Sequence, residues 1–186
     1  MRPDRLVLLF SLCAISLSAF AAVQEPAGYR LERYDSEVPD TLSGAQRVTA
    51  VDVHRLMMQD GAAVIDVIPE HRKPDDLPEG QVWFPVEHRG IAGAVWLPDV
   101  GYGVLSEITE NYLRRHLESI SEGRSDHPMV FYCRTDCWMS WNTAKRAVEY
   151  GYTRVYWFAD GIEDWLFEDF DTEVLTPAAG QRQAIK

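Results

Sequence analysis

Two cysteines, Cys133 and Cys137, lie close enough together to support thiol chemistry within the segment FYCRTDCWMSW, residues 131–141. The apolar run at residues 129–132 is typical of a buried strand and ends at Cys133. A helical pattern follows from Trp141. A cysteine at a strand-to-helix turn faces the unpaired N–H groups and the positive dipole end of the helix, which stabilise a thiolate. We therefore predict that Cys133 is reactive and that Cys137 can pair with it.

Residues 1–21 have the pattern of a secretory signal peptide, with basic residues before an apolar stretch at residues 6–17 and small residues at Ala19 and Ala21. The apolar stretch is short for a membrane span and is interrupted by serines. We therefore predict cleavage after Ala21, a periplasmic location and no membrane association once the signal is removed. Cys13 would leave with the signal, so the mature protein would hold only two cysteines.

That remaining pair of cysteines is expected to be more than a structural staple. Outside the cytoplasm, a lone nearby pair is usually oxidised. A disulfide between Cys133 and Cys137 would close a short loop and would gain little chain entropy. The spacing therefore favours a switchable or reactive pair over a purely structural disulfide.

The length and charge of the chain limit the classes of partner. The 186 residues include 29 acidic and 18 basic side chains, for a net charge of −11. This acidity argues against binding to nucleic acid or to anionic membrane surfaces and is compatible with a cationic protein partner. After removal of the predicted signal, roughly 165 residues remain, which suits one domain with short flanks.

Strand-like and helix-like segments alternate along residues 47–170, which predicts an α/β fold with a central, mostly parallel sheet and helices on both faces. Flanking it, we predict an irregular N-terminal extension at residues 22–46 and a disordered tail at residues 171–186. Residues 68–90, rich in proline and charge, predict a long loop. The predicted strands are 62–67, 94–98, 129–132 and 154–158, and the predicted helices begin near Thr49, Ser106, Trp141 and Asp160.

In open α/β sheets, binding sites lie at the carboxyl ends of the strands. Both Cys133 and Asp66 fall at such ends. The residues expected to form the loop and wall of the site are Arg134, Thr135, Asp136, Trp138, Met139, Ser140 and Asp66. Asp66 could orient Arg134 or cap a loop. His88 could reach the site, although its context is more typical of a solvated loop histidine.

Five short motifs occur in the order and spacing of a rhodanese-like domain, and the sequence resembles that family over residues 47–167. The motifs are Val64-Ile65-Asp66-Val67, Gly90-Ile91-Ala92-Gly93-Ala94, Val130-Phe131-Tyr132-Cys133-Arg134, Gly151-Tyr152 and Asp160-Gly161-Ile162-Glu163-Asp164-Trp165. The cysteine segment and signal pattern also resemble a narrower group of exported proteins. That group is named for a CXXCW motif and is associated with catabolism that depends on pyrroloquinoline quinone (PQQ). Here three residues, not two, separate the cysteines.

The resemblance implies what the cysteine loop would do and also where it departs from the family. Rhodaneses carry sulfur as a persulfide on the strand-end cysteine, here Cys133, in a loop of backbone N–H groups that ends in Arg or Lys. In this sequence Trp138 and Met139 stand at the basic position, and Asp136 adds a negative charge. Arg134 is expected to point away from the sulfur. Phosphatase activity, which needs a loop arginine to bind phosphate, is therefore disfavoured, as is chemistry on thiosulfate.

Three hypotheses of function remain. In the first, Cys133 is a nucleophile or persulfide carrier and Cys137 resolves the intermediate, with Trp138 and Trp141 either excluding water or simply packing in the core. In the second, which the resemblance suggests, the domain is a non-catalytic module that docks on a PQQ-dependent dehydrogenase or its cytochrome. In the third, the two thiolates and Met139 bind copper(I), although no histidine lies nearby in sequence to complete the site. No resident cofactor or metal is predicted.

Overall fold

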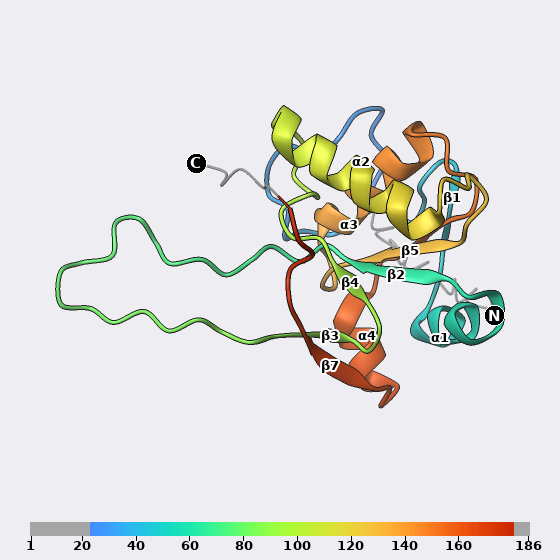
Figure 1. Cartoon of the computed structure of the whole chain (residues 1–186). Helices are drawn as coiled ribbons and strands as arrows, with labels where there is room; N and C mark the ends of the chain where they lie inside the picture. Colours follow the sequence, from blue (N-terminus) through green and yellow to red (C-terminus); the bar gives the residue numbers. More distant parts are fainter. Residues whose placement is uncertain (1–22, 181–186) are drawn as a thin grey trace, which may run out of the picture.

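The computed structural model describes residues 23–180 and shows a five-stranded parallel sheet with helices on both faces (Figure 1). The strands follow one another across the sheet in the order β1-β6-β5-β2-β4, and each neighbouring pair is parallel. Their bounds are β1 Ala45–Arg47, β2 Ala63–Asp66, β4 Val95–Trp96, β5 Met129–Tyr132 and β6 Val155–Phe158. The predicted α/β fold is confirmed. The predicted signal peptide, residues 1–21, lies outside the described residues.

The four helices of the described chain divide between the two faces of the sheet. Their bounds are α1 Ala50–Asp60, α2 Glu107–Ser121, α3 Trp138–Glu149 and α4 Gly161–Phe167. Alternate residues of each strand point to opposite faces. Ile65, Phe131 and Trp157 pack in one hydrophobic core with α2 and α3. Val64, Val130 and Phe158 pack in the other with α1 and α4. Within residues 23–180, no helix has the length and hydropathy needed to cross a bilayer.

The helix starts follow from local capping chemistry. Thr49 and Asp52 form a capping box at the start of α1, in which each side chain accepts from the backbone N–H of the other residue. The Ser106 hydroxyl accepts from the backbone N–H of Thr109 at the start of α2. The α3 helix differs, because its N-cap residue is Cys137 and no side chain caps it. The start of α3 is therefore held by other parts of the chain.

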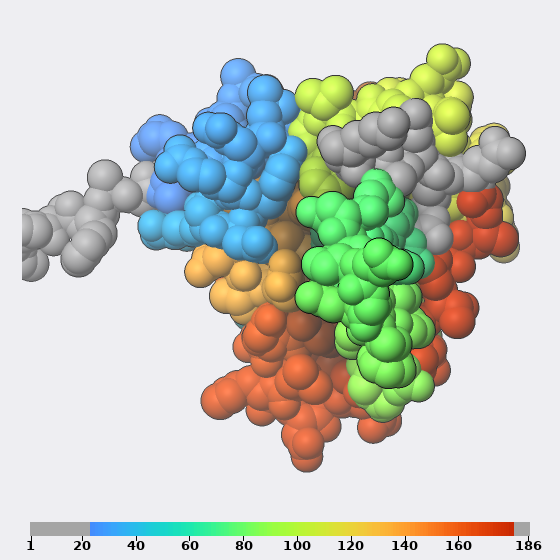
Figure 2. Space-filling model, turned by 90° about the vertical axis from the view of Figure 1, so that its left-hand side faces the viewer, coloured from blue at the N-terminus to red at the C-terminus, as the bar shows by residue number. Residues whose placement is uncertain are grey.

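The N-terminal extension holds no helix or named strand from residue 23 until β1 begins at Ala45, and it packs closely against the domain. Val38 and Leu42 are buried in the same core as α2 and α3. Asp35 forms an isolated antiparallel bridge with Cys137. Figure 2 shows this blue segment lying against the orange α3 region. Because α3 is enclosed between the sheet and the extension, most of its residues are buried, whereas a surface helix buries one face.

A second, two-stranded sheet corrects the prediction of a disordered tail at residues 171–186. Strand β3, His88–Ile91, pairs antiparallel with β7, Thr172–Leu175. The chain then remains attached, because the backbone N–H of Ala178 donates to the carbonyl of Trp96. The tail was predicted wrongly because a four-residue strand gains its hydrogen bonds from a partner some 80 residues away, which leaves no local pattern. Residues 181–186 of the predicted tail lie outside the described residues.

The long loop predicted at residues 68–90 is present up to the start of β3 at His88. It extends away from the body of the domain in Figure 1, leaving the sheet after β2 and returning into β3. Its returning arm exposes three apolar side chains, Val82, Phe84 and Val86, to 72%, 74% and 66%. Apolar groups this exposed, side by side on one segment, are an unusual feature of a surface loop.

Candidate functional site

The two cysteines lie where the sequence places them, between the end of β5 and the start of α3. They are joined in a disulfide, and their Cα atoms are 6.1 Å apart. The exposed fraction is 0% for Cys133 and 2% for Cys137. Both residues are therefore almost fully shielded from solvent in this conformation, and an external thiol can attack only after the surroundings move.

On the side of α4, the backbone of the cysteine loop is bound by a carboxylate. The N–H of Thr135 donates to Glu163 Oε2 at 2.8 Å, and the Thr135 hydroxyl donates to the carbonyl of Asp160 at 2.6 Å. Such a loop N–H would face the oxygens of an anionic substrate in a sulfur-transfer cradle. Here the protein itself supplies the anion. A second anion would meet the like charge of Glu163, so the loop is poorly suited to thiosulfate or phosphate.

On the side of the N-terminal extension, the loop is held by backbone hydrogen bonds. The N–H of Ser36 donates to the carbonyl of Asp136, and the N–H of Trp138 donates to the carbonyl of Tyr34, each at 2.9 Å. The Trp138 indole N–H also reaches the extension, with Ser36 Oγ and the carbonyl of Glu37 both at 3.1 Å. The extension thus occupies the uncapped start of α3 and covers the disulfide.

Arg134 points away from the sulfurs, as expected. Its guanidinium forms an ion pair with Asp35 at 3.2 Å, and the two side chains are 51% and 78% exposed. An exposed pair of this kind contributes at most about 1 kcal/mol to stability. Arg134 is therefore held loosely at the surface, between the extension and a neighbouring cavity that it helps to line.

The remaining predicted wall residues belong to the core. The Trp138 and Trp141 rings meet edge to face, with centroids 5.4 Å apart, and both are buried. The hydroxyl of Ser140 donates to the carbonyl of Cys137 at 3.2 Å and accepts from the Trp157 indole N–H at 3.1 Å. Of the two interpretations of the tryptophans, packing in the core is the one that these contacts support.

Met139 is also buried, against the turn that contains Gly101. A Cβ added to Gly101 would lie 2.3 Å from the Met139 Cβ, so only glycine fits this close approach. Within residues 23–180, no three His, Cys, Asp or Glu side chains are placed to hold a metal ion. The copper hypothesis therefore gains no further ligand from the fold.

Asp66 is fully buried at the end of β2 and caps its own loop. Its Oδ1 accepts from the backbone N–H of Ile68 at 2.8 Å. Its Oδ2 accepts from the Tyr132 hydroxyl at 2.6 Å and lies 2.8 Å from His88 Nε2. Of the two roles predicted for Asp66, loop capping is the one present, because Arg134 is not among its partners. Burial, with the charge and hydrogen bond of Asp66, raises the pKa of Tyr132 well above its usual value.

His88 was predicted to be a solvated loop histidine, and this is wrong. Its side chain is only 14% exposed, bound to Asp66 and stacked on Trp96 with ring centroids 4.0 Å apart. The contact requires a close approach of β3 to β2. A Cβ on Gly90 would lie 2.7 Å from Asp66 Oδ2 and 2.6 Å from the Tyr132 hydroxyl, which leaves room for glycine alone.

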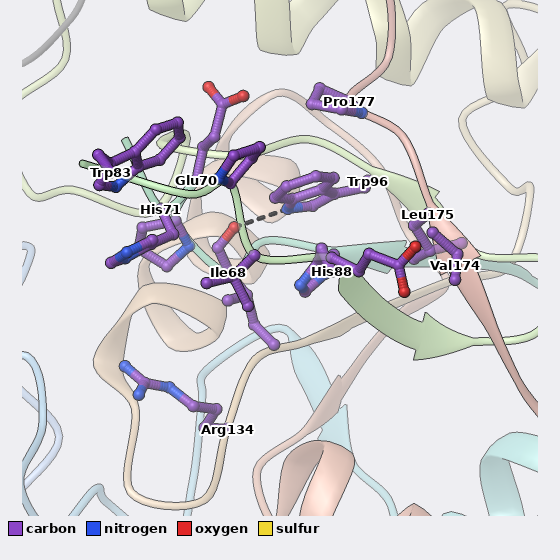
Figure 3. A pocket seen from close by; sticks show the side chains of 14 residues that line it. Ile68, Glu70, His71, Trp83, His88, Trp96, Arg134, Val174, Leu175 and Pro177 are labelled. Atoms are coloured by element: carbon purple, nitrogen blue, oxygen red, sulfur yellow. Dashed lines mark hydrogen bonds between the residues drawn. The ribbon is translucent and has the colours of Figure 1, made fainter. Parts of the chain in front are cut away.

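A cavity of about 550 Å³ lies beside this network, at the carboxyl ends of β2 and β4. Figure 3 shows its walls, which come from both arms of the long loop, from β4 and from β7. Arg134, the residue after Cys133, lines it from the side of the cysteine loop. The candidate site therefore has two parts, a sealed cysteine loop and an open cavity next to it.

Comparison with known proteins identifies the fold family. The family model of the rhodanese-like domain matches residues 49–168, most of the chain. This chain belongs to the rhodanese-like domain family. The match covers β2, β5 and α3, so the cysteine loop of this rhodanese-like domain lies within the matched residues. No curated protein is significantly similar in sequence to it.

Solved structures show similar folds at low sequence identity. The 30 kDa polysulfide-sulfur transferase homodimer from Wolinella succinogenes is 17% identical, covers 70% of this chain and 80% of its own, and has a TM-score of 0.45. A rhodanese-like domain from Anabaena is 15% identical, covers 78% and 92%, and has the same TM-score. An uncharacterized protein from Saccharomyces cerevisiae is 16% identical, covers 68% and 94%, and has a TM-score of 0.40.

Three functional features of this rhodanese-like domain escaped the sequence analysis. Glu163 binds the cysteine loop although it lies 28 residues from Thr135, and the only local signal was an acidic residue in the first turn of a helix. The extension covers α3, and its sequence has no periodicity that would indicate this. His88 pairs with Asp66 across 22 residues of loop. In each case the contact depends on tertiary structure.

Proposed function

We propose that this rhodanese-like domain performs thiol–disulfide or persulfide chemistry with Cys133 and Cys137, and that the disulfide is the oxidised state of the cycle. One observation carries the proposal. The cysteine at the strand end of a rhodanese-like fold is bonded to a second cysteine at the start of the following helix. A resolving thiol in that position returns the pair to the disulfide after each transfer.

The proposed cycle begins with reduction of the disulfide. A dithiol reductant gives two electrons and two protons to the disulfide, yielding two thiols and an oxidised reductant. The Cys133 thiolate then takes the terminal sulfur of a small persulfide, RSSH, and releases RS⁻. Cys137 attacks the inner sulfur of the Cys133 persulfide, which reforms the disulfide and releases hydrosulfide. The same geometry resolves a mixed disulfide at Cys133 by releasing the thiol of the partner.

The charges around the loop support a substrate class for this cycle. Glu163 binds the loop N–H, and Arg134 is paired with Asp35 outside the loop. Neutral or cationic thiols and persulfides would meet less repulsion than thiosulfate. The proposal therefore assigns the site to thiol-bound sulfur or to a protein thiol.

We further propose that the protein works in the periplasm as an accessory protein of PQQ-dependent alcohol catabolism. The support for this is the signal-peptide pattern of residues 1–21 and the likeness of residues 133–141 to the CXXCW-motif group. A PQQ-dependent dehydrogenase or its cytochrome would be the partner. Oxidising conditions in that compartment are consistent with a disulfide as the resting state.

A second candidate is a binding module without turnover, and two observations favour it. Both cysteines are buried, and the extension binds the residues on either side of Cys137. The returning arm of the long loop exposes Val82, Phe84 and Val86, which could contact a protein. In this alternative the disulfide fixes the loop and the partner binds elsewhere.

Turnover by the mature protein tests the proposal. We expect reductant-dependent release of hydrosulfide from a small persulfide, with little turnover of thiosulfate, and loss of turnover in Cys133→Ser. Mixed with the persulfide in the absence of the dithiol, Cys137→Ser should accept sulfur once and stall, because no thiol is left to resolve the persulfide. The double variant gives the background without thiols. If both single variants support growth on alcohols as well as the wild type, the binding module is the correct account.

A further inference from the structure

The cavity beside the cysteine loop has the size and the walls of a small-molecule site. Its volume, about 550 Å³, falls within the range of pockets that hold small organic ligands. Its position at the carboxyl ends of β2 and β4 is where open α/β sheets bind their ligands. The thiol chemistry proposed above makes no use of it.

Two aromatic surfaces face the cavity from different elements. Trp83, on the returning arm of the loop, faces His71 on the outgoing arm, with ring centroids 6.1 Å apart. Trp96, on β4, stacks on His88, which Asp66 holds from beneath. The Trp96 indole N–H donates to the carbonyl of Ile68 at 2.7 Å, so this ring is fixed before any ligand binds. Rigid aromatic walls favour a flat aromatic ring in the ligand.

The polarity of the lining favours a ligand with acceptor oxygens. The Trp83 indole nitrogen is the buried side-chain polar atom of residues 23–180 that has no hydrogen-bond partner. A buried N–H without an acceptor costs about 1–3 kcal/mol, and a ligand oxygen would remove that cost if the Trp83 ring turns its N–H into the cavity on binding.

The lining holds one arginine, Arg134, and two carboxylates, so an anion would bind at Arg134. Within residues 23–180, the ion pair of Arg134 is with the exposed Asp35, so Arg134 can exchange this partner for a ligand at little cost. Of the two carboxylates in the lining, Glu70 is already ion-paired with Arg72 at 3.0 Å. Glu87 is the other carboxylate, and its removal should strengthen the binding of an anion.

We infer that this cavity binds a small aromatic molecule carrying an anionic oxygen group, with the ring against Trp83 and Trp96, a hydrogen bond from the Trp83 N–H and the positive charge supplied by Arg134. The inference does not depend on the thiol cycle. Binding should be the same in the double variant Cys133→Ser/Cys137→Ser, so failure of one proposal leaves the other standing.

Three naphthalene probes of matched shape test the inference on the mature protein: 2-naphthoate, 2-naphthalenemethanol and 2-naphthylmethylammonium. Binding is followed through the indole N–H resonances in ¹H–¹⁵N NMR spectra, with Trp83 assigned from Trp83→Phe. We expect 2-naphthoate to shift Trp83 and Trp96 saturably and to bind at least tenfold more tightly than the cation. Trp165, against α1 on the other face, should not shift.

Variants then test whether Arg134 supplies the positive charge that binds the anionic probe. Arg134→Gln should weaken 2-naphthoate at least threefold and leave the neutral alcohol unchanged, and Glu87→Gln should strengthen 2-naphthoate. Arg154→Gln is the matched control, because Arg154 is also an exposed arginine in a surface ion pair, with Asp60. The inference is overturned if the alcohol or the cation binds as tightly as the acid, if Trp83 does not shift, or if Arg134→Gln and Arg154→Gln behave alike.

Discussion

The cysteine loop and the cavity begin at the ends of neighbouring strands, β5 and β2, but they differ in how their polar groups are satisfied. In the loop, the N–H groups of Thr135 and Trp138 already have acceptors, in Glu163 and in the N-terminal extension. In the cavity, the Trp83 N–H has none within the described residues, and Arg134 is held only by an exposed partner. The family's reactive position is thus closed, while the space beside it is open.

The two regions therefore differ in how readily a small molecule can reach them. A buried disulfide whose loop is held by hydrogen bonds at Thr135, Asp136 and Trp138 reacts only when the loop opens, so its rate depends on local stability. A preformed cavity accepts a ligand without such opening. Substitutions in each region should therefore affect stability, reduction rate and ligand binding differently.

Removal of the Asp66 carboxylate should have the largest effect, because it supports both regions. Asp66→Ala leaves the Tyr132 hydroxyl, the Ile68 N–H and His88 without their acceptor, and we expect the free energy of unfolding to fall by about 3 kcal/mol. Urea unfolding measures this. Asp75→Ala, at an exposed position on the long loop, is the control and should change stability by less than about 0.5 kcal/mol. Equal losses in the two variants would contradict the network.

High pH should weaken the fold through Tyr132. Its pKa is raised in the folded protein, so the folded state keeps a proton that an unfolded tyrosine loses near pH 10. This contribution is complete below pH 10 and is lost as the pH rises above it, by up to about 1.4 kcal/mol per pH unit. Tyr132→Phe should therefore unfold with a shallower pH slope between pH 10 and 11. Parallel slopes for variant and wild type would refute the assignment.

The seal over the disulfide can be loosened at Trp138. Trp138→Phe removes the N–H that binds Ser36 and Glu37, and we expect a loss of about 1 kcal/mol together with faster reduction of the disulfide by an external thiol. Trp165→Phe is the matched control, since it removes an indole N–H bound to the Asp171 carbonyl on the other face. It should lower stability similarly without speeding reduction. If both variants speed reduction equally, the extension is not a specific seal.

The carboxylate at the loop should select among reductants by charge. The wild type should be reduced faster by cationic cysteamine than by anionic mercaptoethanesulfonate, and Glu163→Gln should lower that ratio by about threefold. Stopped-flow kinetics at low ionic strength measure the ratio. Glu118→Gln on α2 keeps the same net charge as Glu163→Gln and serves as the control. An unchanged ratio in Glu163→Gln would show that its charge does not act at the loop.

The sequence predicted the parts of the fold that depend on local pattern. The capping box at Thr49, the Ser106 cap and the apolar strand into Cys133 each involve residues within a few positions, and each is present. The β3–β7 sheet was missed because its pairing energy comes entirely from distant segments. Thr172–Leu175, predicted as part of a disordered tail, therefore form strand β7.

For the candidate site, too, the sequence predicted only the features that depend on local pattern. Cys133 and Asp66 follow from their strand ends and Cys137 from its spacing to Cys133, and the structure brings Asp66 and Tyr132 side by side in register. The closure of the loop by Glu163 and by the extension could not be predicted, because it depends on how α4 and residues 23–44 pack after folding. His88 was misassigned for the same reason, since only the fit of Gly90 against Asp66 brings it inward.

The redox equilibrium of the folded mature protein shows whether Cys133 and Cys137 cycle between dithiol and disulfide. Incubation over a series of dithiol-to-disulfide ratios, followed by alkylation and mass measurement, gives the fraction of Cys133 and Cys137 that is reduced. We predict one reversible two-electron transition of the folded protein, with circular dichroism unchanged across it. A disulfide that stays intact until the protein unfolds would contradict the account, because the pair would then be a structural link and no part of a cycle.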